Sequence, residues 1–294
     1  MNRTNDTSAL LSSVNTLYKH HVNWHEAVTC AIEIELRDYA KLLQFLTEYK
    51  LGKNYYRIDL LIVKKLSGQV IPKNIACIFK TYNLVECKGI HSSLTVNAYY
   101  KTIGYAGLLI DQLNNTHPEQ YTSLDISLTF LTFHYPRKLI NHLTEERQLI
   151  VEKTSEGIYH ISIEIFDVQI IVTNKLPPEE NLYLRCLTNN LTDTDLANRL
   201  VNDYARHCDR DIYIKYLNQL ITANLKTEGG SLMVCEGLLN LFGTSSEEII
   251  AKAKKESADY YQPRIDELSA SIAQLSSQNN YLKELLKQHN ISFE

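Results

Sequence analysis

Residues 83–89 read NLVECKG, a short apolar run that carries one acid and one base two positions apart. A glycine closes the run directly after Lys88, so the stretch is typical of a short β-strand. Side chains two positions apart project from the same side of a strand, which places Glu86 beside Lys88 and turns Cys87 the other way. The sequence therefore predicts a carboxylate and an ammonium side by side on one face of a sheet.

A second lone carboxylate, Asp59, lies upstream in a similar setting. Residues 55–65 are apolar and β-branched enough for a buried strand, and Ser67-Gly68 supplies a turn after them. Neighbouring antiparallel strands lie about 4.8 Å apart, so Asp59 and Glu86 can converge on one cation if they share a face. Mg²⁺ prefers oxygen ligands and typically takes one or two protein carboxylates, with waters and substrate phosphate oxygens completing its shell.

These residues in this pattern indicate metal-dependent phosphodiester chemistry. Asp59 and Glu86 are the predicted ligands of Mg²⁺ or Mn²⁺, and the backbone carbonyl of Cys87 is a further candidate ligand. Lys88 is the predicted catalytic residue, because an ammonium beside the metal can orient a water and offset charge on the phosphoryl group. Two simpler interpretations stay open: Asp59 pairs with Arg57 or a lysine, and Glu86 forms a plain salt bridge with Lys88.

The charge around these carboxylates favours a polyanionic partner. Between Lys50 and Lys101 there are nine Lys and Arg but only two acids, a local net charge of +7 in a chain of net charge −4. A basic window in an acidic protein can direct one face at nucleic acid, although ordinary solvation of scattered lysines is the alternative. The candidates for phosphate contacts are Lys64, Lys65, Lys73, Lys80 and Lys101.

The composition is that of a soluble globular protein, with 44% hydrophobic and 22% charged residues. The N-terminus lacks the layout of a signal peptide, and no apolar run approaches the roughly 18 residues that a membrane helix needs. The six cysteines are scattered without a Cys-x-x-Cys pair, which favours free thiols and a cytoplasmic location. His20, His21 and His25 have no matching Cys or carboxylate spacing, so we expect surface histidines.

The order of predicted elements indicates an α/β fold. Helices are expected over residues 24–49 and 97–111, and strands over 55–65, 84–88 and 124–133, with two or three more strands in 149–173. Pro177-Pro178 marks a boundary, beyond which the chain is expected to be helical to about residue 241, with a capping signal at residues 192–195. The predicted domains are a lead-in (1–23), a nuclease-like domain (24–176), a helical region (177–243) and a C-terminal helix or coiled coil (244–294).

The pattern Asp59 followed by Glu86-Cys87-Lys88, after a helix that bears Glu35, resembles the PD-(D/E)XK nuclease superfamily. The longer strings RIDLLIVKK (57–65), NLVECK (83–88) and YKTIGYA (100–106) resemble a group of Firmicutes proteins close to the transposase-like, recombination-promoting nuclease branch. The similarity covers about residues 24–240, and Cys87 stands where that group usually has Tyr. The resemblance implies a restriction-endonuclease-like core, a mixed central sheet flanked by helices. It also implies metal-ligand roles for Asp59 and Glu86, a catalytic role for Lys88, and a first-helix catalytic acid at Glu35.

The C-terminal helix is predicted to form a parallel two-stranded coiled coil that makes the protein a homodimer. Its apolar residues recur in alternating steps of three and four, with one Asn at a core position that fixes register. The alternative is a single amphipathic helix folded onto its own domain. The predicted core positions are Ile265, Leu268, Ile272, Leu275, Asn279, Leu282 and Leu286.

Three functions compete for this sequence. The first is a metal-dependent nuclease that hydrolyses phosphodiester bonds of nucleic acid, most simply DNA, without a membrane partner. The second is a non-catalytic nuclease-fold module that binds nucleic acid or partners and dimerises through its coiled coil. The third is a pure coiled-coil scaffold, which predicts no affinity for nucleic acid. Metal-dependent cleavage that disappears in Lys88→Ala separates the first two.

Overall fold

The structure is a computed structural model of the chain, and its residues fall into two compact units, Met1–Leu241 and Phe242–Glu294. The described residues are 22–52, 56–66, 68–116, 120–163, 165–207, 210–224, 226–228, 231–233, 262–263, 266–267, 269–280 and 283.

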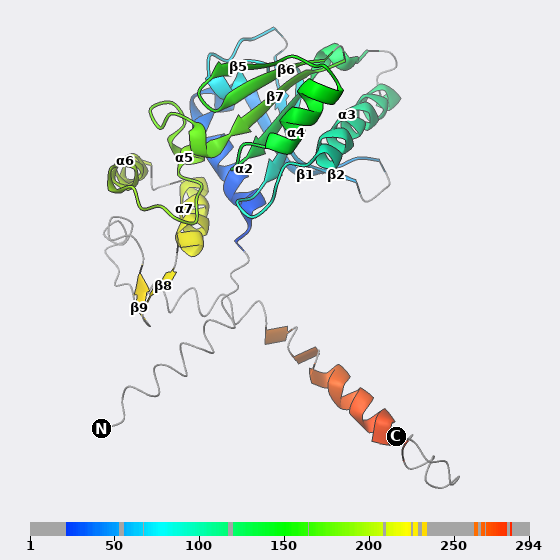
Figure 1. Cartoon of the computed structure of the whole chain (residues 1–294), viewed down its shortest axis with the longest axis vertical. Helices are drawn as coiled ribbons and strands as arrows, with labels where there is room; N and C mark the ends of the chain where they lie inside the picture. The colour runs from blue at the N-terminus through cyan, green and yellow to red at the C-terminus, as the bar shows by residue number, and fades with distance from the viewer. Residues whose placement is uncertain are drawn as a thin grey trace. The chain divides into compact units, whose positions relative to one another are not determined.

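A seven-stranded mixed sheet forms the centre of the first unit, in the order β1-β2-β3-β4-β7-β6-β5 (Figure 1). The α/β class predicted from the sequence is confirmed by this sheet and its flanking helices. The strands are β1 (Leu43–Lys50), β2 (Arg57–Lys64), β3 (Tyr82–Lys88), β4 (Ile126–Thr132), β5 (Val151–Ser155), β6 (Ile158–Ser162) and β7 (Asp167–Val172).

Strand direction changes across the sheet. β1, β2 and β3 pair antiparallel, β4 is parallel to both β3 and β7, and β7, β6 and β5 are again antiparallel. Every residue of β4, ISLTFLT, is buried. Its Ser127, Thr129 and Thr132 are buried along with its apolar residues, so both faces of this central strand are covered.

Helices cover both faces of the sheet (Figure 1). On one face, α3 (Val96–Thr116) and α4 (Arg137–Asn141) join a large apolar cluster that includes Leu84 and Phe130 of the sheet. On the other face, Ile32 of α2 (Trp24–Glu35) lies near Val85 of β3, and the short helix α5 (Leu182–Arg185) packs beside it. The alternation along β3 sends neighbouring side chains to the two opposite layers.

Of the helices after the sheet, α5 and α7 (Asp211–Asn224) pack against α2, and α6 (Thr194–Ala205) packs against α5. α6 begins at the predicted capping signal, where Asp193 accepts a hydrogen bond from the N–H of Leu196. α7 is tied to the start of α2, because the Gln219 side chain bonds both the Asn23 N–H and the Glu26 carboxylate. The short turns between elements are η1 (Arg37–Leu42), η2 (Asn74–Ala76), η3 (Ser123–Asp125), the π turn η4 (His142–Glu146) and η5 (Thr173–Lys175).

Two predictions of secondary structure were wrong. The helix expected over residues 24–49 ends at Glu35, and residues 43–50 form the edge strand β1, because pairing with β2 along one side overrides a weak helical preference. The helical stretch expected to run to residue 241 contains an antiparallel pair, β8 (Lys226–Glu228) and β9 (Ser231–Met233). The predicted strands at 55–65, 84–88 and 124–133 and the helix at 97–111 are confirmed with shifted ends.

In the second unit, residues 269–280 are helical. Ile272 and Leu275 of the predicted coiled-coil core are 64% and 63% exposed there, and Asn279 is exposed as well. The side chains of the other predicted core positions, Ile265, Leu268, Leu282 and Leu286, lie outside the described residues. Across the described parts of both units, no helix is long and apolar enough to cross a membrane.

Candidate active site

Asp59 and Glu86 lie opposite each other on neighbouring strands. The β2–β3 register pairs Leu60 with Val85, and one further step along the same register sets Asp59 against Glu86. Residues at opposed positions of antiparallel strands share a face, so the two carboxylates point to the same side of the sheet. Lys88 follows on that side, while the buried Cys87 side chain turns away.

The Asp59 carboxylate takes the place of the next backbone hydrogen-bond partner between β2 and β3. Its Oδ2 accepts the N–H of Cys87 at 2.8 Å, just beyond the last paired residues of β2 and β3. Burial raises the pKa of Asp59, and the nearby Glu86 carboxylate raises it further. Two partly desolvated carboxylates that repel each other form a place where a cation is favoured.

Two lysines meet the buried Glu86 side chain, which is 3% exposed. Lys88 Nζ lies 2.6 Å from Glu86 Oε1, and Lys101 Nζ, from α3, lies 3.3 Å from the same oxygen. Burial would lower the pKa of Lys101, but the neighbouring Glu86 carboxylate holds that pKa above its ordinary value. The same-side placement of Glu86 and Lys88 predicted from their spacing is confirmed, and Lys101 belongs to this site as well.

Two further ligand types reach Asp59 from elements that the sequence analysis did not connect with it. His25 Nδ1, in the first turn of α2, lies 3.5 Å from Asp59 Oδ2. Glu48 stands opposite Asp59 in the β1–β2 register, with a φ of +49° that is uncommon for a residue other than glycine. Donor atoms of His25, Glu48 and Asp59 lie within 4.8 Å of one another. Imidazole and carboxylate oxygens together suit Mn²⁺ or Zn²⁺ as well as Mg²⁺.

The structure does not bring Glu35 to this site, so its geometry gives no support to the predicted role of Glu35 as a catalytic acid. His25 is the residue of α2 that contacts Asp59, and ten residues of helix, about 15 Å of rise, separate it from Glu35. The buried Glu35 carboxylate instead accepts hydrogen bonds from Lys73 Nζ at 3.0 Å and from the Tyr183 N–H at 2.7 Å. Burial raises the pKa of Glu35, and the Lys73 ammonium opposes that rise.

Four of the five lysines predicted to contact phosphate have partners within the protein. Lys64 Nζ donates to the carbonyls of Gln69 and Phe79, and burial followed by the nearby Lys80 lowers its pKa. Lys80 forms an ion pair with Asp167 at 2.7 Å, and Lys73 forms one with Glu35. Among these lysines, Lys65 alone is exposed with no side-chain partner in the described part of the chain.

The missed residues had only weak signals in the sequence. His25 precedes Asp59 by more than thirty residues, and its neighbours His20 and His21 make it look like one member of a surface group. Glu48 becomes visible only once residues 43–50 are recognised as a strand, because the β1–β2 register then sets it against Asp59. Arg57, the alternative partner of Asp59, lies near Glu48 instead, at 3.5 Å.

Comparisons with known proteins do not identify a relative. Nothing matches the chain among protein-family models, curated proteins or solved structures.

Proposed function

We propose that this protein is a metal-dependent nuclease that hydrolyses phosphodiester bonds, with DNA as the substrate and Mg²⁺ or Mn²⁺ as the cofactor. The observation that carries the proposal is the convergence of Asp59, Glu86 and Lys88 at one end of the β2–β3 pair, with Lys101 beside them. Carboxylates for a hard cation and ammonium groups for a phosphoryl group are the two parts that such a reaction needs.

The order of elements supports this proposal. Helix α2, the antiparallel strands β1, β2 and β3, helix α3 and the parallel strand β4 follow one another along the chain. This is the arrangement that the resemblance to PD-(D/E)XK nucleases leads us to expect of a restriction-endonuclease-like core. In it the ligand-bearing strands β2 and β3 adjoin, and the helices on either side each send one residue, His25 and Lys101, to the carboxylates.

The residues of the site fit a divalent cation. Asp59 and Glu86 would hold it, and His25 and Glu48 offer further donor atoms on the Asp59 side. A bound Mg²⁺ or Mn²⁺ supplies an activated water and neutralises charge on the phosphoryl oxygens. With Glu86 as a ligand, Lys88 would lie beside the cation, where its ammonium could orient a water or contact the scissile phosphate. Lys101, less enclosed at 42% exposed, can contact the neighbouring phosphate.

A second candidate has an observation of its own. Lys88 and Lys101 already neutralise Glu86 within the protein, so this carboxylate has its partners without a cation. Such an arrangement also suits a non-catalytic module of the same fold that binds nucleic acid through its lysines. In either case we propose that the exposed Ile272 and Leu275 pair with a second copy in a parallel coiled coil, since a stripe of apolar side chains on a helix favours a partner.

One experiment separates the two candidates. Mn²⁺ is titrated calorimetrically into the wild type, Lys88→Met and the control Lys138→Met, an exposed lysine of α4, and each is then assayed on plasmid and single-stranded DNA. The nuclease proposal expects cleavage by the wild type and by Lys138→Met, a loss of orders of magnitude in Lys88→Met, and similar or slightly tighter Mn²⁺ binding in that variant. A wild-type protein that binds DNA, binds no Mn²⁺ and does not cleave supports the binding module.

A further inference from the structure

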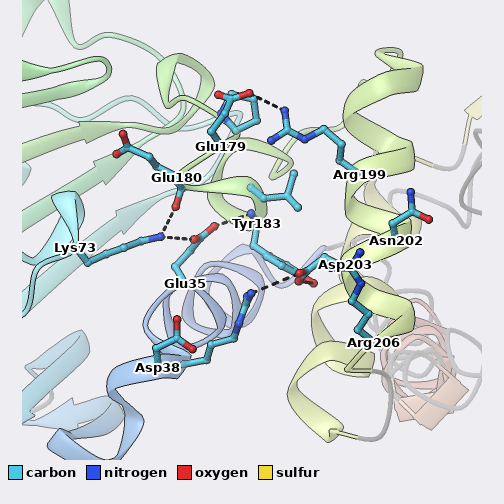
Figure 2. Close-up of a pocket in the computed structure, with 13 residues that line it drawn as sticks. Glu35, Asp38, Lys73, Glu179, Glu180, Tyr183, Arg199, Asn202, Asp203 and Arg206 are labelled. Atoms are coloured by element: carbon cyan, nitrogen blue, oxygen red, sulfur yellow. Dashed lines mark hydrogen bonds and ion pairs between the residues drawn. The ribbon is translucent and has the colours of Figure 1, made fainter.

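A hollow in the first unit, with a volume of about 450 Å³, is lined by none of the residues Asp59, Glu86 and Lys88 (Figure 2). We call it the α6 pocket. One wall is a stripe of α6, a second is the end of α2 with the start of η1, and the loop before α5 and Lys73 complete it. Its lining is mostly polar and charged: Glu35, Arg37, Asp38, Lys73, Pro178, Glu179, Glu180, Leu182, Tyr183, Arg199, Asn202, Asp203 and Arg206.

The carboxylates of the α6 pocket are largely satisfied by the protein itself. Glu35 accepts from Lys73 and from the backbone of α5. Asp203 accepts the Tyr183 hydroxyl at 2.8 Å and lies 3.5 Å from the Arg37 guanidinium. Two more, Glu179 and Glu180, also have donors, at 2.7 Å from Arg199 to Glu179 and 2.6 Å from Asn74 to Glu180. Their capacity to accept further hydrogen bonds from a ligand is therefore reduced.

Several hydrogen-bond donors of the α6 pocket, unlike its carboxylates, have few or weak partners within the protein. Arg206 and Asn202 line the pocket from α6 and its C-terminal end, both are exposed, and neither has a side-chain partner in the described part of the chain. Arg37 has five N–H groups, and its hydrogen bonds to the Ile34 carbonyl and to Asp203 are both long, at 3.5 Å. Arg199 is held by a solvent-exposed ion pair, which a ligand can displace at little cost.

Spare guanidinium and amide donors around a polar hollow are the groups that bind oxyanions, phosphate above all. The volume exceeds that of a lone phosphate and lies in the range of small-molecule sites. Asp38, the one lining carboxylate for which no hydrogen bond or ion pair is described, can accept a hydrogen bond from a hydroxyl or amino group of the same ligand. We propose that the α6 pocket binds a small phosphate ester that also carries hydroxyl or amino groups, the chemistry of a nucleoside monophosphate.

This site is independent of the proposed nuclease chemistry. The residue of α2 that lines the pocket, Glu35, lies about 15 Å of helix rise from His25, the residue of α2 that reaches Asp59. A ligand in the α6 pocket therefore needs no metal, and its binding can be measured in the presence of a chelator. Failure of metal-dependent cleavage leaves this proposal standing, and failure of this proposal leaves the catalytic one.

The test is calorimetric titration of the full chain, in a chelator, with adenosine monophosphate, guanosine monophosphate, inorganic phosphate and an oligonucleotide without terminal phosphate. Arg206→Glu is compared with Arg210→Glu, which makes the same charge change at an exposed arginine outside the pocket. Asn202→Asp is a second pocket variant, and thermal unfolding checks that all variants are folded.

We expect a nucleoside monophosphate to bind with a dissociation constant below about 1 mM, and more tightly than inorganic phosphate. Loss of one charge-assisted contact should weaken binding about tenfold or more in Arg206→Glu, with a smaller loss in Asn202→Asp and none in Arg210→Glu. The proposal is overturned if no monophosphate binds, if both arginine variants lose affinity equally, or if the unphosphorylated oligonucleotide binds as well and with the same dependence on Arg206.

Discussion

Replacing Glu35 with alanine should destabilise the first unit without changing the affinity of the metal site. Its side chain is only 5% exposed and accepts three hydrogen bonds, from Lys73 Nζ at 3.0 Å and from the N–H groups of Tyr183 and Leu184 at 2.7 and 3.4 Å. These bonds hold α5 against the end of α2. The variant leaves two backbone donors and a partly buried ammonium without this acceptor.

The cost can be estimated from these contacts. Removing one partner of a buried charged pair typically costs about 3–5 kcal/mol. Lys73 also donates to the Glu180 carbonyl and keeps that partner, so we expect the low end, about 3 kcal/mol. For a unit of this size that corresponds to a melting temperature about 6–12 °C lower. Glu35→Gln retains an acceptor oxygen and should lose roughly half as much.

Urea unfolding followed by fluorescence measures this change in the first unit alone. The only tryptophan, Trp24, lies in α2 against Gly89, so its signal reports on the unit that contains Glu35. Glu33→Ala is the matched control, because it removes a partly buried acid two residues earlier for which the structure gives no hydrogen bond. A Glu35→Ala protein that unfolds within about 1 kcal/mol of the wild type would refute the anchoring role. Weaker Mn²⁺ binding by the folded Glu35→Gln variant would indicate that Glu35 contributes to the metal site.

Three further predictions concern the other features. Burial, and then Glu86, raises the pKa of Asp59, so the folded chain holds this proton more tightly than the unfolded chain. The contribution of Asp59 to stability therefore falls as pH rises from its ordinary pKa of 3.8 through the raised value. Asp59→Asn should make the metal-free protein more stable at neutral pH and reduce the change of its stability with pH. Unfolding of both proteins at about pH 4 and pH 8 in a chelator measures this effect. The same pH dependence of stability in the variant and the wild type counts against the geometry. His25→Ala should weaken Mn²⁺ binding more than Mg²⁺ binding, since imidazole suits transition metals better, and a calorimetric ratio unchanged from the wild type would exclude His25 as a ligand. A chain ending near residue 260 should be monomeric where the full chain is a dimer, and light scattering that finds a monomeric full chain at micromolar concentration contradicts the coiled coil.

The placement of Glu86 beside Lys88 was predictable from the sequence. The residues that other elements bring to Glu86 were harder to predict. Glu86 and Lys88 lie in one strand two residues apart, so the alternation of side chains alone sets them on one face. Asp59 joins them only if β2 and β3 pair in one particular register. A slip of one residue would turn Asp59 to the opposite face, and composition gives no information about that choice.

The errors share a physical cause. Residues 43–50 read LQFLTEYK, a mixture that fits a helix or a strand, and the decision is made by β2, which pairs with the backbone of these residues along one side. The charge count of the basic window misses the partners of its lysines for a related reason. Lys73 and Lys80 are close in sequence, but each pairs with a carboxylate from a distant part of the chain, Glu35 and Asp167.

Helix α2 shows most clearly what periodicity leaves undetermined. A helical pattern indicates which side of a helix is buried, but an acid and a histidine ten residues apart can serve sites about 15 Å from each other. Here the first turn of α2 supplies His25 to Asp59, and the last turn supplies Glu35 to Lys73 and α5. The buried acid on the first helix therefore has the burial expected of a catalytic residue and the contacts of an anchor. Burial alone could not separate the two roles; the partners that each end of the helix meets do.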